Sequence, residues 1–229
     1  MKKKLTLYHG SRDMITQPQF GLGREHNDFG RGFYCTESPD LAKEWACTPA
    51  HNGFANKYLL DTSGLMILNL NTPEFTILHW MALLVNHRVF RIRNPIAGRA
   101  KKYLTTNYLI NVSAYDAIIG YRADDSYYDF ADAFLNNAIT VEQLALAMRL
   151  GKLGEQFVLK SLTAFDRIRF DSAEVAENEI YYPKRKMRDE TAALSYRKIT
   201  ENDADGLYMI DILRNGVKSD DPRIPRNIP

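Results

Sequence analysis

The chain has 229 residues, of which 45% are hydrophobic and 25% are charged, and its formal net charge is +2. This composition suits a soluble protein with a real core, and the near-balanced charge neither requires nor excludes a nucleic-acid partner. No apolar run reaches the ~20 residues of a membrane-spanning helix, and no apolar segment of a signal peptide follows the N-terminal lysines. We therefore expect a cytoplasmic protein that does not contact a membrane.

Cysteine and histidine usage excludes two further classes. The two cysteines, Cys35 and Cys47, do not make a disulfide framework, and we expect reduced thiols. The five histidines are scattered and none shares ligand spacing with a cysteine, so we expect no metal site.

The first seventy residues are predicted to form four short strands and one helix, in chain order strands 5–8 and 32–36, a helix from Pro39, and strands 57–61 and 65–70. The first strand leads into a His9-Gly10-Ser11 turn, and the glycines and polar residues of 12–31 predict a loop. Ser38 is suited to cap the helix, with Pro39 at the first helical position.

The rest of the chain is predicted to hold more helix than strand, in chain order helix 73–89, strand 115–121, helix 129–150 with a break near Thr140, strand 156–159, one or two charged helices in 184–214, and an irregular tail 220–229. The spacing lacks the regular strand–helix alternation of a doubly wound parallel sheet. We predict an α+β fold with a curved, mostly antiparallel sheet.

Two short motifs near the N-terminus carry the strongest chemical signal. Leu7-Tyr8-His9-Gly10-Ser11 is a turn after a strand, and Asp28-Phe29-Gly30-Arg31-Gly32-Phe33-Tyr34 leads into the second strand. The pair resembles the front half of the NAD site of ADP-ribosyltransferases of the His-Tyr-Glu type, the poly(ADP-ribose) polymerase-like branch. The resemblance implies NAD as a consumed co-substrate and a split ADP-ribosyltransferase-like sheet with a helical insertion and C-terminal helices.

The resemblance also implies roles for the matching residues. His9 would hydrogen-bond a ribose hydroxyl of the adenosine half. The backbone of Gly10 would bond the nicotinamide carboxamide, with Ser11 beside it in the cofactor-binding turn. Tyr34 would pack against the nicotinamide ring, and Trp45 on the following helix would stack on the other ring face, since aromatic faces attract a cationic pyridinium.

Plainer interpretations of these residues remain open. A His-Gly pair also occurs in ordinary polar turns, and Trp45 shares a helix face with Leu41, as a core residue would. The chain also departs from the resembled pattern at Ala42, where polymerase-type members carry a serine that bonds the carboxamide. A hydrogen bond lost in this way is worth about 1 kcal/mol.

The position of the catalytic acid differs too. In the resembled family a glutamate opens a strand of the form Glu-aromatic-β-branched-aliphatic, and Gln156 has that place in Gly154-Glu155-Gln156-Phe157-Val158-Leu159. Neighbours in a strand point to opposite faces, so only one of Glu155 and Gln156 can face the ligand. A glutamine can orient the nicotinamide ribose but cannot supply a negative charge or accept a proton. This pattern favours transfer of single ADP-ribose units, and the alternative is a catalytically weak or inactive NAD or ADP-ribose binder.

A second constellation is Tyr121-Arg122-Ala123-Asp124-Asp125-Ser126, between a strand and a helix. Loops of this kind commonly carry ligands. Arg122 could hold the pyrophosphate or a target phosphate, and Asp124 or Asp125 could supply the charge that Gln156 lacks. The alternative is that Asp125 or Ser126 only caps the helix.

The block from Tyr115 to Tyr127 and the stretch from Leu150 to Gln156 look like a bacterial family of uncharacterised proteins in the ADP-ribosyltransferase superfamily. This resemblance implies a toxin or effector, with a small antitoxin-like protein as a partner of some members. We expect an NAD-binding domain over 1–171, with the helical insertion in 57–150, and a charged helical extension over 172–229. The acceptor of ADP-ribose could be a protein, a nucleic acid or a small molecule, and the charged helices could engage a partner protein or simply pack on the domain.

Overall fold

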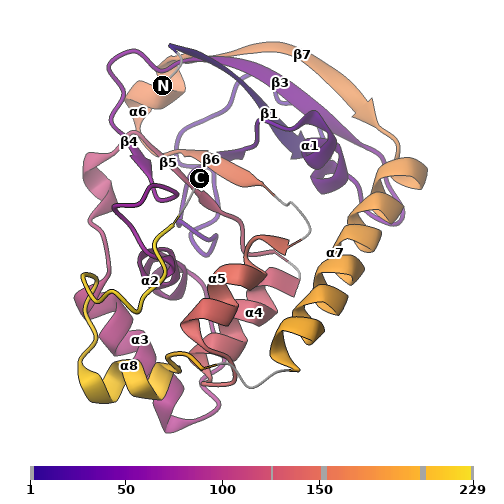
Figure 1. Ribbon diagram of the computed structural model, residues 1–229. Helices are drawn as coiled ribbons and strands as arrows, with labels where there is room; N and C mark the ends of the chain where they lie inside the picture. The colour runs from indigo at the N-terminus through magenta and orange to yellow at the C-terminus, as the bar shows by residue number, and fades with distance from the viewer. Residues whose placement is uncertain (1–2, 125, 151–153, 202–204, 228–229) are drawn as a thin grey trace.

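The computed structural model describes residues 3–124, 126–150, 154–201 and 205–227 (Figure 1). Within these ranges the chain forms an α+β fold of eight α-helices and two mostly antiparallel sheets. The predicted fold class is confirmed.

The first sheet has the strand order β1 (Lys4–Ser11), β3 (Gly53–Asp61) and β7 (Ile168–Ala176). Both pairings are antiparallel. Leu5 and Leu7 alternate with exposed residues along β1 and are buried, which is the period-two pattern of a strand with one face on the core. Strand β7 was not predicted, because most of its side chains are exposed or half-buried and its apolar residues do not stand out.

The second sheet has the strand order β2 (Phe33–Cys35), β6 (Glu155–Leu159), β5 (Ala117–Tyr121) and β4 (Ile67–Asn69). Its pairs are antiparallel except for β4 with β5. Two backbone hydrogen bonds join the sheets, from Tyr8 N to Thr36 O at 2.7 Å and from Thr36 N to Tyr8 O at 2.9 Å. These bonds bring the end of β1 beside β2.

The helices are α1 (Pro39–Ala46), α2 (Ile77–His87), α3 (Pro95–Asn107), α4 (Ser126–Leu135), α5 (Val141–Ala147), α6 (Leu162–Asp166), α7 (Asn178–Thr200) and α8 (Met209–Asn215). Helices α2, α3, α4, α5 and α8 gather on the side away from the β1-β3-β7 sheet, and α7 runs along one flank from the end of β7 (Figure 1). Helix α2 is buried on nearly all sides, as expected of a helix that is apolar all round.

Several helix boundaries differ from the sequence-based expectations. The predicted 129–150 helix is divided into α4, which ends at Leu135, and α5, which Thr140 caps, so the expected break is confirmed. Helix α2 begins after Thr76 rather than at residue 73, because Thr76 caps it. Helix α3 was missed, although Asn94 accepts from the N–H of Ala97 at 2.9 Å as an N-cap does. Helix α7 begins at Asn178, upstream of the expected 184.

From α8 the tail runs back to the end of β4, where the side chain of Asn227 donates to Leu70 O at 2.6 Å. The described part of the tail, residues 220–227, is irregular as predicted. The division at residue 171 stays a prediction, and that residue lies inside β7. None of the described helices is long and apolar enough to cross a membrane.

Candidate functional site

A cleft of about 760 Å³ opens where the ends of β1, β2 and β6 meet helix α1. Its volume is within the ~300–1,000 Å³ range of small-molecule and cofactor sites. Its lining includes seven of the residues that the sequence singled out: His9, Gly10, Tyr34, Trp45, Arg122, Asp124 and Gln156. Motifs from distant parts of the chain thus converge on one cavity.

His9 is held in one tautomer. Its Nδ1 lies 2.7 Å from the carbonyl oxygen of Tyr34, and its ring stacks on Phe33 with 4.4 Å between centroids. A carbonyl only accepts, so Nδ1 carries the hydrogen and Nε2 is left as an acceptor. Burial lowers the pKa of His9, the Tyr34 carbonyl opposes this, and the positive charge of Arg122 lowers the pKa further. A neutral His9 can therefore accept a hydrogen bond from a ligand hydroxyl.

Gly10 is required by the fold itself. A Cβ at this position would lie 2.0 Å from the carbonyl oxygen of Ala42 in α1, so only glycine lets β1 and α1 approach this closely. The same contact buries Ala42, which does not line the cleft. Ser11 does not line the cleft: its hydroxyl donates to Asp13 O at 2.6 Å and accepts from Asn56 Nδ2 at 2.9 Å, which holds it in the turn.

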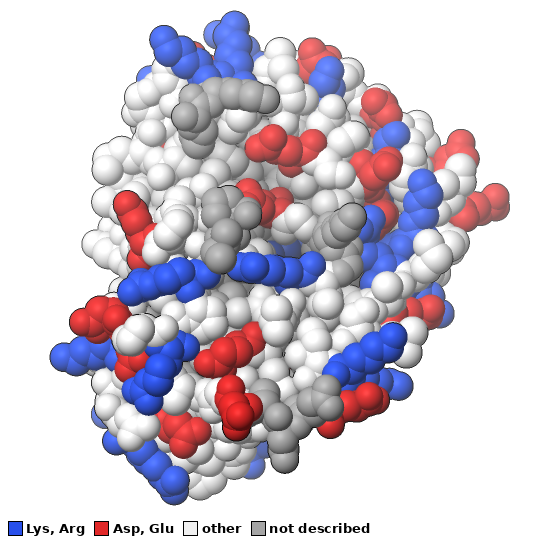
Figure 2. Space-filling view, in the orientation of Figure 1, with Lys and Arg blue, Asp and Glu red and all other residues white. Residues whose placement is uncertain are grey.

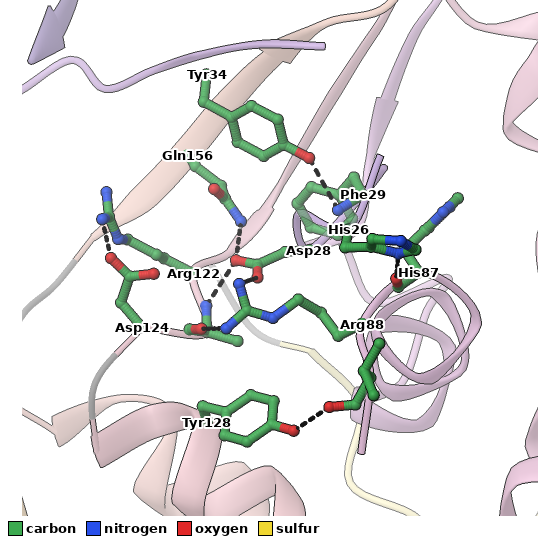
Figure 3. Close-up of polar contacts among 12 residues, drawn as sticks. His26, Asp28, Phe29, Tyr34, His87, Arg88, Arg122, Asp124, Tyr128 and Gln156 are labelled. Carbon is green, nitrogen blue, oxygen red and sulfur yellow. Dashed lines mark hydrogen bonds and ion pairs between the residues drawn. The ribbon is translucent and has the colours of Figure 1, made fainter. Parts of the chain in front are cut away.

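Tyr34 ties the cleft wall to the preceding loop. Its hydroxyl accepts from the N–H of Phe29 at 3.0 Å (Figure 3). The same hydroxyl donates to Gly30 O at 2.6 Å. Burial raises the pKa of Tyr34, so the phenol stays neutral. The ring lines the cleft while the hydroxyl fixes the loop.

Trp45 lines the cleft beside a cation. The guanidinium of Arg122 stands 3.5 Å from the centroid of the Trp45 ring and also pairs with Asp124. Trp45 is half-buried whereas Leu41 on the same helix is buried, so the plain core interpretation suits Leu41 better. One face of the Trp45 ring is covered by Arg122.

The first turn of the helix that follows this loop, α4, is bonded to helix α7. Asp125 lies outside the described residues. The N–H of Ser126 donates to Asp189 Oδ1 of α7 at 2.9 Å. An aspartate on a distant helix thus accepts from the first turn of α4, and the loop before it contributes Arg122 and Asp124 to the cleft.

The two candidate positions for the acid separate as strand alternation requires. Gln156 is buried on the cleft side, and its Nε2 donates to Asp28 Oδ2 and to Tyr121 O, both at 2.9 Å. The side chain of Glu155 lies outside the cleft and accepts from Asn71 Nδ2 at 2.7 Å.

Asp28 is a cleft residue that sequence reasoning missed. It is 4% exposed and accepts from the N–H of Ala123 at 2.8 Å and from Gln156, while Arg88 Nη1 stands 3.6 Å from its other oxygen (Figure 3). Burial raises the pKa of Asp28, and the hydrogen bonds from Ala123 and Gln156 and the positive charge of Arg88 make this rise smaller. Asp28 opens the segment Asp28–Tyr34 but has no role in the resembled pattern, and Arg88 is in a segment without a distinctive motif. The signal that pointed to Asp28 was an acid just before the Gly-x-Gly strand.

Lys160 secures the loop that carries Asp28. Its Nζ donates to Phe29 O at 2.6 Å and to Arg31 O at 2.5 Å, from the end of β6. Burial lowers the pKa of Lys160 to about 8. Lys160 therefore joins the loop on one side of the cleft to the strand that holds Gln156.

The described lining residues of the cleft carry more positive than negative charge. Its lining includes three arginines and two aspartates, namely Arg24, Arg88, Arg122, Asp28 and Asp124. An excess of arginine suits a ligand with phosphate groups, which guanidinium groups bind in a bidentate manner. Among the described residues, no group of three or more His, Cys, Asp or Glu side chains could hold a metal ion.

A family model matches residues 5–170, from the first strand to the start of β7. The chain belongs to that family, which is described as protein of unknown function (DUF3990). The matched DUF3990 segment contains every cleft residue named above. Neither the curated proteins nor the solved structures include a match to this chain.

Proposed function

We propose that this DUF3990 protein is an NAD-dependent mono-ADP-ribosyltransferase that transfers one ADP-ribose unit to a macromolecular acceptor. One observation carries the proposal. The residues that match the His-Tyr-Glu pattern, or replace it, line a single cleft of cofactor size: His9, Gly10, Tyr34, Trp45 and Gln156.

The chemistry of the cleft suits each part of NAD. The Nε2 acceptor of His9 matches a ribose hydroxyl, and the arginine excess matches the pyrophosphate. The rings of Tyr34 and Trp45 offer apolar faces to the nicotinamide ring. NAD would enter with its nicotinamide end toward Gln156.

The reaction is a displacement at the nicotinamide ribose. The bond from C1″ to the nicotinamide nitrogen breaks, and its electron pair leaves with nicotinamide. An acceptor nucleophile forms the new bond to C1″ and releases its proton to water. Positive charge develops on the ribose as the bond breaks, so a site that holds the ribose near negative charge favours the step.

A direct test uses NAD labelled in its adenine half, incubated with the protein and a bacterial lysate. We expect labelled macromolecules with the wild-type chain and at least a tenfold loss with His9→Ala. His51→Ala is the matched control, because His51 is exposed and does not line the cleft. Equal labelling by the wild-type and His9→Ala proteins would overturn the proposal.

The second candidate is a module that binds NAD or ADP-ribose without turnover. Gln156 favours this second candidate because its amide carries no negative charge to promote turnover. Both hydrogens of the amide are also already bound to protein acceptors. Calorimetry with NAD and with a non-hydrolysable analogue, beside a nicotinamide-release assay, separates the two candidates. Binding without release would support the module.

The acceptor and the partner are a further part of the proposal. Basic and acidic side chains of the described residues are interspersed on the face drawn in Figure 2, so its charge favours neither a nucleic acid nor a protein acceptor. A toxin or effector role, with an antitoxin-like partner, follows from the resemblance. Growth arrest of bacteria that express the wild-type chain but not His9→Ala would support this role.

A further inference from the structure

We infer that Asp28 carries the negative charge that ADP-ribose transfer needs, in place of the glutamate expected at position 156. The inference rests on the proposed function. It concerns a loop residue that the His-Tyr-Glu pattern does not include.

Asp28 lies one hydrogen bond from the expected position of the acid. Its Oδ2 is 2.9 Å from Nε2 of Gln156, and both residues line the cleft. The loop that faces the strand therefore holds a carboxylate at the end of the cleft where the resembled family has its glutamate (Figure 3).

The contacts of Asp28 hold its carboxylate in place and favour the ionised form, against its burial, which raises its pKa. The N–H of Ala123 and the amide of Gln156 both donate to Oδ2, and Arg88 stands near Oδ1. Hydrogen bonds to a carboxylate stabilise its charged form. These contacts also hold the group still, as catalysis by a preorganised charge requires.

Asp124, the other acid among the described residues that line the cleft, is the weaker candidate. Its side chain is 28% exposed and pairs closely with Arg122, whereas that of Asp28 is 5% exposed and stands 3.6 Å from Arg88. A charge shielded from water acts more strongly on a neighbouring charge. The electrostatic field of the Asp124 carboxylate is also largely cancelled by the positive charge of Arg122.

Asp28 and Gln156 would together have the two roles of the single glutamate of the resembled family, which are to orient the ribose and to supply negative charge. Both amide hydrogens of Gln156 point to acceptors, Asp28 and Tyr121 O, so its Oε1 is left for a hydroxyl of the nicotinamide ribose. Asp28 would stabilise the positive charge on the ribose as the bond to nicotinamide breaks. Asp28 takes no proton in this step.

The test moves the negative charge from position 28 to position 156. Asp28→Asn should lower kcat for nicotinamide release by about 10²–10³-fold while NAD affinity changes less than threefold. Gln156→Glu should bring no gain, because two carboxylates in contact share a proton. The double variant Asp28→Asn/Gln156→Glu should recover at least tenfold of the lost rate, since it returns one carboxylate to the pair.

The rescue distinguishes charge from structure, because a purely structural role of Asp28 would not be restored by a carboxylate at 156. Asp61→Asn, at an exposed site outside the cleft, is the matched control and should keep the wild-type rate. If Asp28→Asn does not fold, Gln156→Glu and a folded double variant carry the test. A folded double variant without activity would overturn the inference.

Other outcomes separate this inference from the proposed function. Full activity of Asp28→Asn, or a rate of Gln156→Glu more than tenfold above wild type, overturns the role of Asp28 and leaves the transferase. A wild-type chain that binds NAD without releasing nicotinamide overturns the inference and leaves the binding module. A wild-type chain that neither binds NAD nor releases nicotinamide overturns both.

Discussion

The side-chain amide of Gln156 donates to the carboxylate of Asp28 at 2.9 Å, across 128 positions of the chain. This bond joins β6, where the resembled family has its acid, to the loop that precedes Tyr34. Lys160 joins the same two segments through Phe29 O and Arg31 O. The loop before Tyr34 and strand β6 therefore form one connected wall of the cleft, and substitutions can test each of its contacts separately.

Gly10→Ala should destabilise the protein by about 3 kcal/mol or more, at the upper end of overpacking effects. The new Cβ would meet the Ala42 carbonyl at 2.0 Å, and backbone of a helix cannot move aside as a side chain can. Urea unfolding measures the change. Gly98→Ala in α3 is the matched control, because its Cβ would be 3.7 Å from the nearest atom, so stability should stay level or rise by up to ~1 kcal/mol. Equal stability of both variants would contradict the close contact.

Stability should fall as the pH drops below about 6.5. Burial lowers the pKa of His9, His79 and His87, so the unfolded chain takes up protons that the folded chain resists. By linkage, the free energy of unfolding then decreases with falling pH. Urea unfolding from pH 7.5 to 5 should show this slope, and His9→Asn should reduce it. An unchanged slope in His9→Asn would show that His9 is not the neutral, shielded group described.

Lys160 should add a second rise of stability with pH, on the alkaline side of the profile. Its pKa is lowered to about 8, below the 10.5 of a free lysine, so between these values the unfolded chain binds more protons. Stability should therefore rise with pH from about 8 to 10.5. Lys160→Met should remove this rise and, by releasing Phe29 O and Arg31 O, weaken NAD binding. Lys57→Met is the control, since Lys57 is on β3 and its pKa is raised by Asp171. A wild-type profile that is flat above pH 8 would contradict this prediction.

Helix α7 should depend on an ion pair with α1. Glu44 is 2% exposed, and Arg188 donates to its two oxygens at 2.9 and 2.7 Å. Removal of one partner of a buried pair costs about 3–5 kcal/mol, and partial exposure of Arg188 reduces this to roughly 2–3 kcal/mol for Arg188→Ala. Thermal unfolding should show the loss, whereas Arg197→Ala on the exposed side of α7 should change little. Similar stabilities of the two variants would mean that the pair does not hold α7 in place.

Local signals explain which elements were predicted. Ser38 and Thr140 cap helices through their own side chains, and Leu5 and Leu7 alternate with polar residues, so these features are legible from a few neighbours. Strand β7 and helix α3 were missed because their exposed faces dilute the apolar pattern. The resemblance to an NAD site could be recognised for the same reason, since each of its motifs is a short continuous segment.

The sequence by itself determined the fold class, most elements and the candidate positions His9, Gly10, Tyr34, Trp45 and Gln156, because these depend on residues close together in the chain. Only the tertiary structure decided that Gln156 rather than Glu155 faces the cleft, that Ser11 turns away from it, and that Asp28 meets Gln156. Those outcomes depend on how β6 pairs with β2 and β5 and on where an aperiodic loop lies against them. Such long-range pairing leaves no periodic trace in the sequence.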